Sequence, residues 1–292
     1  MPDRIALEMA KQGWDKPIPV QLFSFFAKMF QGDLGESFFH PGEDITEGLL
    51  TRMPATIELT LAALLLAIPL GITAGVAAAV WRNRFPDFLC MSGSMVGISI
   101  PVFFLGICLM SIFTGLPSGG RMPVDVEFDS DSGLYILESI WYQDWELAGL
   151  LLAHICLPAF ALSSIPMAII ARVTRSSMLE VLSADYIRTA RSKGCSVVRV
   201  VLRHAFPNAA VPVTNICAFQ VGLLLSGAVL TESVFSWPGL GTYLAEGVQN
   251  SDYSVVQGGA LVVAGLFVTI NLILDVVYVW LDPRIRLEGR EE

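Results

Sequence analysis

The sequence predicts an all-α protein, built as a polytopic bundle of transmembrane helices. Hydrophobic residues make up 54% of the 292 residues and charged residues 15%, with a mean hydropathy of +0.62. This is too apolar for a soluble protein of this size. The apolar residues also gather in five long stretches with at most one acidic residue each, namely 55–81, 88–114, 147–171, 205–231 and 254–281.

Each of the five stretches is long enough to be a span. The uncharged run from Leu59 to Val80 would reach about 33 Å as a helix, against a hydrocarbon core of about 30 Å. Small residues of the first stretch share one helical face, which suits close contact with another helix: Gly71, Ala74, Gly75 and Ala78. Six prolines in or beside the stretches are expected to kink helices: Pro69, Pro101, Pro158, Pro166, Pro207 and Pro212.

The basic residues predict how the chain is oriented. Cytoplasmic segments of membrane proteins are enriched in Lys and Arg. Twelve of the 18 Lys and Arg residues fall in three segments, at positions 82 and 84, between 172 and 203, and between 284 and 290. The segment 115–146 instead carries seven acidic residues and the single Arg121. We therefore expect five spans of alternating direction and a cytoplasmic C-terminus.

Residues 1–54 are expected to form a periplasmic amphipathic region. No apolar segment precedes them that could carry them across the membrane. We infer a sixth, N-terminal helix that this sequence lacks, with export of the tail without a signal as the alternative. Packing against neighbouring helices is favoured over a lipid-surface anchor for an apolar stripe in this region, made of Leu22, Phe23, Phe25, Phe26, Met29 and Phe30.

Catalysis, metals and nucleic acids are not expected. The five cysteines include no CxxC pair, and the three histidines lie far apart in the sequence, so nothing predicts a metal or another cofactor. HExxH and GxSxG strings are absent from the sequence, which speaks against an intramembrane enzyme. The basic residues lie beside the membrane and carry no nucleic-acid signal.

The polar residues of the spans are expected to differ in their roles, and a structural role is favoured for Glu58. Glu58 is predicted to lie in the first turn of its helix near the outer surface, where the helix dipole stabilises a negative charge. Asn215 and Gln220 are better candidates for lining a pore, although hydrogen bonds between helices explain them as well.

The segment from Arg172 to Pro212 is long, basic and patterned. Apolar residues at helical spacing predict a helix, for which Ser183 is an expected N-cap and Gly194 the C-terminal stop. A second helix is expected from Val197 onward. Two short helices around a glycine turn would form a projecting knob. From the residues alone, the knob is equally suited to docking a protein and to holding anionic lipid headgroups.

This segment resembles the EAA loop of ABC importer permeases. The pattern of that loop is EAA, three residues, Gly, nine residues and then I-x-L-P. The sequence matches this spacing with Arg188, Thr189 and Ala190, then Gly194, then His204, and finally Phe206 and Pro207. Four of these residues differ in type from the pattern: Arg188 replaces Glu, Thr189 replaces Ala, His204 replaces Ile and Phe206 replaces Leu. The strings DYIRTARSKG and RHAFPNA are the form that the loop takes in the peptide and nickel branch.

The resemblance to this branch covers nearly the whole chain and is strongest to dipeptide permeases. It is carried by the strings WDKP, GDLGESF, RSSMLEVL, TESVFSWPGLG, DYSVVQGG and DPRIR. It implies a type I permease domain over residues 55–282, with the EAA loop at about 176–207 and a cytoplasmic tail at 283–292. Aromatic residues after the fourth span suit an interfacial turn that closes the outer mouth or meets a binding protein: Phe235, Trp237 and Tyr243.

The resemblance also implies a function. The chain would be a non-enzymatic permease subunit of a dipeptide or oligopeptide importer in the bacterial cytoplasmic (inner) membrane. Its partners would be a second homologous permease in a heterodimer, two ATP-binding cassette ATPases and a periplasmic or extracellular solute-binding protein. The residues that couple it to an ATPase would be Asp185, Tyr186, Arg188, Thr189, Ala190, Arg191, Gly194 and Pro207.

Two alternatives remain open from the sequence. Within the family, nickel or another small solute could replace the peptide, because specificity lies largely with the separate binding protein. Outside the family, an ATP-independent secondary transporter would be expected to show buried ionisable groups and repeated halves. Neither is evident in the sequence. Its substrate-binding residues are not predicted.

Overall fold

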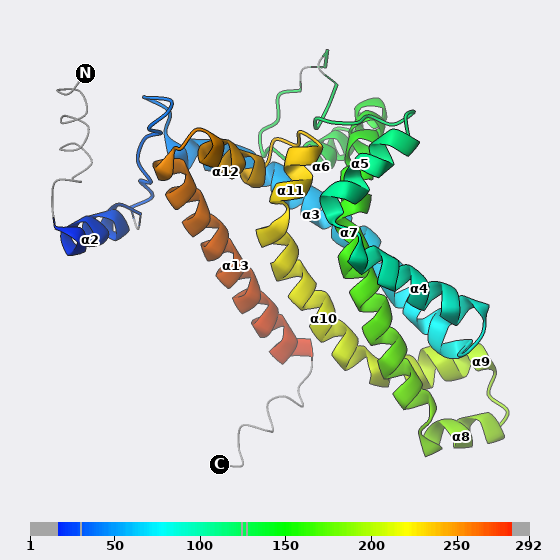
Figure 1. Ribbon diagram of the computed structural model, residues 1–292. Helices are drawn as coiled ribbons and strands as arrows, with labels where there is room; N and C mark the ends of the chain where they lie inside the picture. Colours follow the sequence, from blue (N-terminus) through cyan, green and yellow to red (C-terminus); the bar gives the residue numbers. More distant parts are fainter. Residues whose placement is uncertain (1–16, 30, 124, 127, 282–292) are drawn as a thin grey trace.

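The computed structural model describes residues 17–29, 31–123, 125–126 and 128–281, which fold largely into helices (Figure 1). An isolated antiparallel bridge joins Glu36 to Asp44. The helices in chain order are α2 (Ile18–Met29), α3 (Ile45–Val80), α4 (Phe85–Ser99), α5 (Val102–Ile112), α6 (Tyr135–Trp141), α7 (Trp145–Leu182), α8 (Asp185–Ser192), α9 (Val197–Arg199), the π-helix η1 (Val200–Ala205), α10 (Phe206–Gly227), α11 (Val229–Val234), α12 (Leu240–Gln249) and α13 (Tyr253–Leu281).

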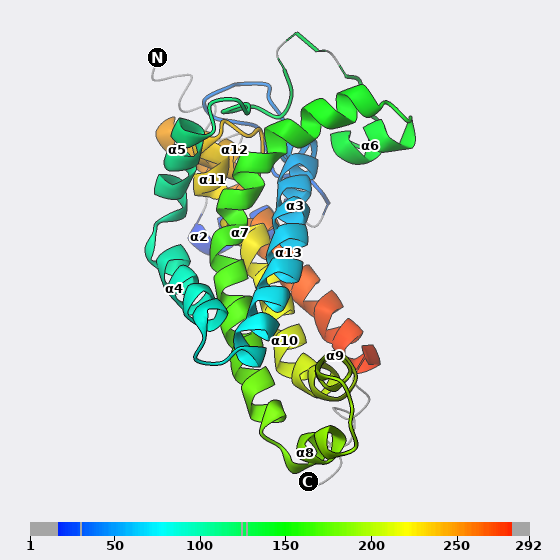
Figure 2. The same cartoon turned by 90° about the vertical axis from the view of Figure 1, so that its right-hand side faces the viewer.

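Helices α3 and α7 lie side by side along their lengths and form the centre of the bundle (Figures 1 and 2). Glycines permit the close approach that the small-residue face of the first span predicts. A Cβ atom on Gly71 would lie 2.9 Å from the Ile170 side chain, and one on Gly75 would lie 2.5 Å from the carbonyl oxygen of Ala171. Any larger residue at either position would push the two helices apart.

The second predicted span is a broken pair of helices. α4 and α5 are bent by 108° relative to each other. Ile100, which separates them, has extended backbone with ψ 123°, and Pro101 follows as the N-cap residue of α5. A proline disfavours helical backbone at the residue before it, which explains the break at this point. Pro69, Pro158, Pro166 and Pro212 lie inside continuous helices instead.

The C-terminal half completes the bundle. α10 packs between α7 and α13, and α11 and α12 fold over one end of it, where we call residues 229–249 the cap (Figure 1). An apolar core joins α3, α7, α10 and the cap, built from Ala55, Leu59, Ala63, Leu64, Ile155, Ala159, Leu162, Leu224, Ala228 and Trp237. Helices α8 and α9 lie at the opposite end of the bundle from the cap (Figure 2).

The predicted spans correspond to helices of the structure. Within the described residues, α3, α7 and the part of α13 over Tyr253–Ile273 are each long and apolar enough to cross a membrane, and α4 with α5 passes the same test as one broken span. The remaining predicted span is α10, with 22 residues, which would reach about 33 Å. The first span begins earlier than predicted, because α3 starts at Ile45 with Asp44 as its N-cap.

The N-terminal stripe does form a helix, but it does not pack as predicted. Leu22 in α2 is 55% exposed and Phe23 is 79% exposed, and Phe26 is also exposed. The favoured interpretation, packing against neighbouring helices, is therefore wrong for Leu22 and Phe23 within the described part of the chain. Residues 1–16, Phe30, the side chain of Phe25 and the predicted tail lie outside the described residues.

Candidate functional site

The predicted coupling loop forms a compact knob at the end of α7. We use this name for residues 183–205, which hold α8, α9 and η1. The knob rests on an apolar cluster with the ends of α3 and α7, in which Ile187 and Met178 are fully buried. The other buried members of this cluster are Ala79, Val200, Val201, Ala205 and Ala209. Because the Ile187 side chain is buried in this cluster, α8 is packed against the ends of α3 and α7.

Gly194 ends α8 in the way the sequence predicts. Its φ is +77°, a conformation that residues with a Cβ rarely adopt. Its backbone N–H donates to the carbonyl of Arg191, and that of Cys195 donates to the carbonyl of Ala190. This pair of bonds is the Schellman motif, which satisfies carbonyls at the end of a helix. The turn reverses the chain from α8 back toward the bundle.

The start of α8 differs from the prediction. Ala184 is its N-cap residue and makes no side-chain cap hydrogen bond. The Ser183 hydroxyl donates instead to the carbonyl of Glu180, in the last turn of α7. Ser183 is therefore not the cap that we expected. Helix α7 continues to Leu182, beyond the predicted span, and takes up residues that the sequence assigned to the knob.

The second helix of the knob begins at Val197, as predicted, and continues into the next span. α9 has only three residues, and the π-helix η1 joins it to α10 without an intervening loop. π-helical turns are rare and often occur at functional sites. Pro207 is the second residue of α10 and follows η1 directly.

The structure brings most of the predicted coupling residues together on α8. Asp185, Arg188, Thr189 and Arg191 are exposed, Tyr186 is 46% exposed, and Ala190 is half-buried against the apolar cluster. Gly194 follows directly and is exposed. Pro207 is the exception, because it belongs to α10 and not to the exposed helix of the knob.

The exposed charged side chains of α8 form only a weak ion pair with each other. Arg188 Nη1 lies 3.9 Å from Asp185 Oδ1, and both side chains are more than 80% exposed, at 83% and 97%. An ion pair this exposed contributes little to stability. The polar side chains are thus available to another molecule at little energetic cost.

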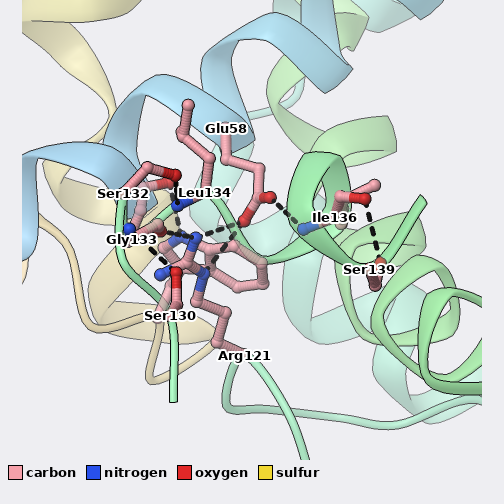
Figure 3. A network of polar contacts seen from close by, with 10 residues as sticks. Glu58, Arg121, Ser130, Ser132, Gly133, Leu134, Ile136 and Ser139 are labelled. Carbon is pink, nitrogen blue, oxygen red and sulfur yellow. Dashed lines mark hydrogen bonds and ion pairs between the residues drawn. The ribbon is translucent and has the colours of Figure 1, made fainter. Parts of the chain in front are cut away.

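A buried network at the cap end is a feature that the sequence did not reveal (Figure 3). Arg121 donates from Nε and Nη2 to Glu58 Oε2, at 2.9 and 2.5 Å, and the other carboxylate oxygen accepts from the backbone N–H of Ile136 at 2.7 Å. Arg121 Nη2 also donates to the carbonyl of Gly133, and its guanidinium lies 3.8 Å from the centre of the Tyr135 ring. The network fixes the acidic segment to α3.

The prediction for Glu58 was wrong in its mechanism. Since α3 begins at Ile45, Glu58 does not lie in the first turn, and the helix dipole acts only near that turn. Its charge is instead balanced by Arg121, with side-chain exposures of 7% and 6%. The only signal in the sequence was that Arg121 is the single basic residue among seven acidic ones.

A second ion pair joins α4 to α7 near the knob. Arg175 donates to both carboxylate oxygens of Asp87, at 2.5 and 2.9 Å, and the backbone N–H of Asn83 donates to Asp87 as well. The Asp87 side chain is 5% exposed. Such bidentate geometry fixes the direction of both side chains.

The cap is attached to α3 through a buried carboxyl group. Glu232 is fully buried; Thr56 Oγ1 donates to its Oε1 at 2.7 Å, and the N–H of Thr242 donates to its Oε2 at 3.1 Å. Burial raises the pKa of Glu232, which lies beyond the spans, although the hydrogen bonds from Thr56 and the backbone oppose this. A Cβ on Gly239 would overlap the same carboxyl group. This explains why glycine follows Trp-Pro in the sequence.

Three aromatic residues of this region do not form an interfacial turn. Phe235, Trp237 and Tyr243 are 1%, 1% and 5% exposed. Trp237 Nε1 donates to the carbonyl of Ala55 in α3 at 2.9 Å. They therefore hold the cap on the bundle and are not available to meet a binding protein. Of the two pore candidates on α10, Asn215 is exposed, whereas Gln220 is buried.

Comparisons with known proteins agree over nearly the whole chain. Residues 67–287 match the family described as "Binding-protein-dependent transport system inner membrane component". A di/tripeptide transport system permease of Pseudomonas aeruginosa is 41% identical over 98% of this chain and 86% of its own length. A dipeptide permease of Escherichia coli is 42% identical at the same coverage, and a glutathione permease of Salmonella typhimurium is 38% identical over 97% of this chain and 84% of its own length.

Two solved structures share the fold. A chain of the inward-facing MetNI methionine ABC transporter aligns with a TM-score of 0.56 at 16% identity, covering 76% of this chain and 91% of that chain. A chain of an amino acid ABC transporter crystallised with histidines aligns with a TM-score of 0.53 at 13% identity, covering 80% of this chain and 92% of its own. At these identities the likeness concerns the fold alone.

Proposed function

The chain belongs to the family of binding-protein-dependent transport system inner membrane components, and we propose that its knob couples peptide import to ATP hydrolysis by a partner. As a permease subunit of an ABC importer it is not an enzyme. The relatives of about 40% identity transport dipeptides or tripeptides by name, which supports a dipeptide or oligopeptide as the substrate. The glutathione permease is a slightly less identical relative, and its named substrate is also a small peptide.

The observation that carries the proposal is the construction of the knob. It presents the polar and exposed side chains of α8 at one end of the long helices, while Ile187 anchors it to α3 and α7. A force on α8 is therefore transmitted directly to two helices of the bundle. In this proposal, movement of an ATPase subunit rotates α8 as a rigid body, and α3 and α7 follow.

Members of this family work with ATPases and a substrate-binding protein. We infer that this chain pairs with a second, similar permease. Two ATPase subunits would dock at the knob end of the pair, and the binding protein would meet the cap end. The basic residues of the knob support a cytoplasmic location for that end and for the C-terminus under the positive-inside rule. Arg188, which is exposed on α8, then faces acidic residues of an ATPase.

Co-purification of the ATPases with the tagged chain tests the coupling. Gly194→Val should reduce the recovered ATPase severalfold, since the positive φ of Gly194 is unfavourable to a β-branched residue by about 1 kcal/mol or more. There is open space around Gly194, so the variant should perturb the turn and not the core of the bundle. Yield and elution volume of the membrane protein report whether it still folds.

Gly42→Val is the matched control. Gly42 also has a positive φ, +95°, and open space around it, but it precedes α3 at the cap end. This variant should keep its ATPase. Equal ATPase recovery from both variants, with both folded, would contradict the proposed role of the knob. A Tyr186→Ala variant changes only an exposed side chain of α8. ATPase recovery with this variant gives a second test of whether α8 contacts the ATPase.

A further inference from the structure

A groove opens between the knob and the ends of α3 and α7. Its volume is about 470 Å³, within the range typical of small-molecule sites. The ends of α3, α7 and α8 line it, together with α9, η1 and the turns after α3 and α8. Its lining includes Val80, Arg82, Leu182, Arg191 and Val197. The groove lies beside α8, apart from its outward surface.

The lining combines an apolar wall with two positive charges. Aliphatic residues make up most of the wall, and no acidic residue is among the lining residues. Arg82 comes from the turn after α3 and Arg191 from α8. Neither guanidinium has an ion pair or hydrogen bond within the described part of the chain, although Arg82 interacts at longer range with the Asp87 carboxylate, which is already paired with Arg175. Such a lining is complementary to a molecule with an anionic head and an apolar tail.

The groove also lies at the level where a membrane surface is expected. α3 ends at Val80, and the residues beside Arg82 include exposed aromatic side chains, with Trp81 47% and Phe85 75% exposed. Trp is enriched at membrane–water interfaces, and basic pockets between transmembrane helices bind anionic headgroups. The apolar wall continues from α3 and α7, which are themselves candidate spans.

We propose that this groove binds one anionic phospholipid of the adjacent leaflet. Arg82 and Arg191 hold its phosphate through charge-assisted hydrogen bonds, and the first part of an acyl chain lies along Val80, Leu182 and Val197. The lipid fills the space between the knob and the bundle and so stiffens the connection on which coupling depends. A segment of an ATPase would instead be expected on the exposed surface of α8.

Native mass spectrometry of the purified chain in detergent, titrated with phosphatidylglycerol or phosphatidylcholine, tests this inference. The wild type should retain one phosphatidylglycerol and little phosphatidylcholine. The double variant Arg82→Gln/Arg191→Gln should bind phosphatidylglycerol about 25-fold more weakly, at about fivefold for each arginine near an anionic surface. Val197→Glu, at a position 67% exposed, should also lose the lipid, because it places a negative charge in the wall.

Arg84→Gln/Arg188→Gln is the matched control. It removes the same charge from the same turn and the same helix, at exposed residues that do not line the groove, and should bind the lipid as the wild type does. Equal loss from both double variants would overturn the proposal, because the attraction would then be diffuse. So would equal retention of phosphatidylcholine by the wild type, a comparison that does not depend on any variant folding.

Two further outcomes separate the lipid from other occupants. Inorganic phosphate at millimolar concentration should not displace the phosphatidylglycerol, and complete displacement would reassign the groove to free phosphate. If Arg82→Gln/Arg191→Gln releases the ATPases from the assembled complex while lipid binding is unchanged, the two arginines contact protein and the proposal fails.

Discussion

At the scale of single residues, buried charges are the least expected feature of this chain. Glu58 and Arg121 lie 63 residues apart in the sequence, and the Glu58 carboxylate accepts hydrogen bonds from Arg121 and from the backbone of Ile136 (Figure 3). A charge is tolerated in such a place only when it is paired and hydrogen-bonded. Removal of one partner leaves the other charge buried alone.

Glu58→Gln should therefore destabilise the folded protein strongly. The expected loss is about 3 to 5 kcal/mol, as for other buried pairs that lose one member. Thermal unfolding in detergent measures it. The double variant Glu58→Met/Arg121→Met should recover much of the loss, because it removes both charges at once.

Asp185→Asn provides the comparison. It breaks an ion pair in which both residues are exposed, and the expected change is below about 1 kcal/mol. If Glu58→Gln were as mild as Asp185→Asn, the pair in Figure 3 would not be buried in the protein in detergent.

At the scale of elements, the cap depends on the protonation of one carboxyl group. Glu232 connects α11 to Thr56 in α3 and to the first turn of α12. Because burial raises its pKa in the folded state, its contribution is fully favourable below the ordinary carboxyl pKa of about 4.3 and is lost as pH rises through the raised value. Ionisation of this buried carboxyl group therefore lowers the stability of the folded protein, because the cost of burying the charge exceeds the gain from the hydrogen bonds that it accepts.

The midpoint of thermal unfolding should consequently differ between wild type and Glu232→Gln in a pH-dependent way. Near pH 5 the two should be similar, since the neutral amide resembles the protonated acid, and toward about pH 8 the wild type should become the less stable of the two. Glu246→Gln, on the exposed side of α12, should show no such divergence. Parallel pH curves for wild type and Glu232→Gln would disprove the assignment.

Some helix positions could be predicted from the sequence, and others could not. Long apolar runs located the helices of the bundle, and Gly194 correctly predicted the end of α8, because both signals are local. The sequence did not reveal that α3 starts at Ile45, since residues 45–54 are too polar to look like part of a span. It also misplaced Ser183, because two helix ends close together offer a hydroxyl two sets of backbone partners.

Tertiary contacts account for the errors in the candidate sites. The aromatic residues near Trp237 appeared suited to an interface, but the carbonyl of Ala55 accepts from the indole and draws the ring into the core. The apolar stripe of α2 predicts packing, but Leu22 and Phe23 are exposed, and no helix within the described residues covers them. Periodicity predicts which face of a helix is apolar and does not identify what covers it.

At the scale of the whole molecule, the architecture separates two ends with different constructions. The cap end is held by buried polar groups of Glu58, Glu232 and Trp237. The knob end places exposed charges on an apolar cluster. Helices α3 and α7 run between the two ends and contact each other along their lengths. In the proposed mechanism, a displacement of the knob reaches the cap through these two helices.

ATP-driven uptake into proteoliposomes tests the central claim most directly. The chain would be reconstituted with its second permease, the ATPases and the binding protein, and accumulation of labelled dialanine would be followed with and without ATP, with nickel as the competing substrate. The account predicts ATP-dependent accumulation of the dipeptide that Gly194→Val abolishes while Gly42→Val leaves it intact. Uptake without ATP, uptake of nickel and not of dialanine, or full uptake by Gly194→Val would contradict it.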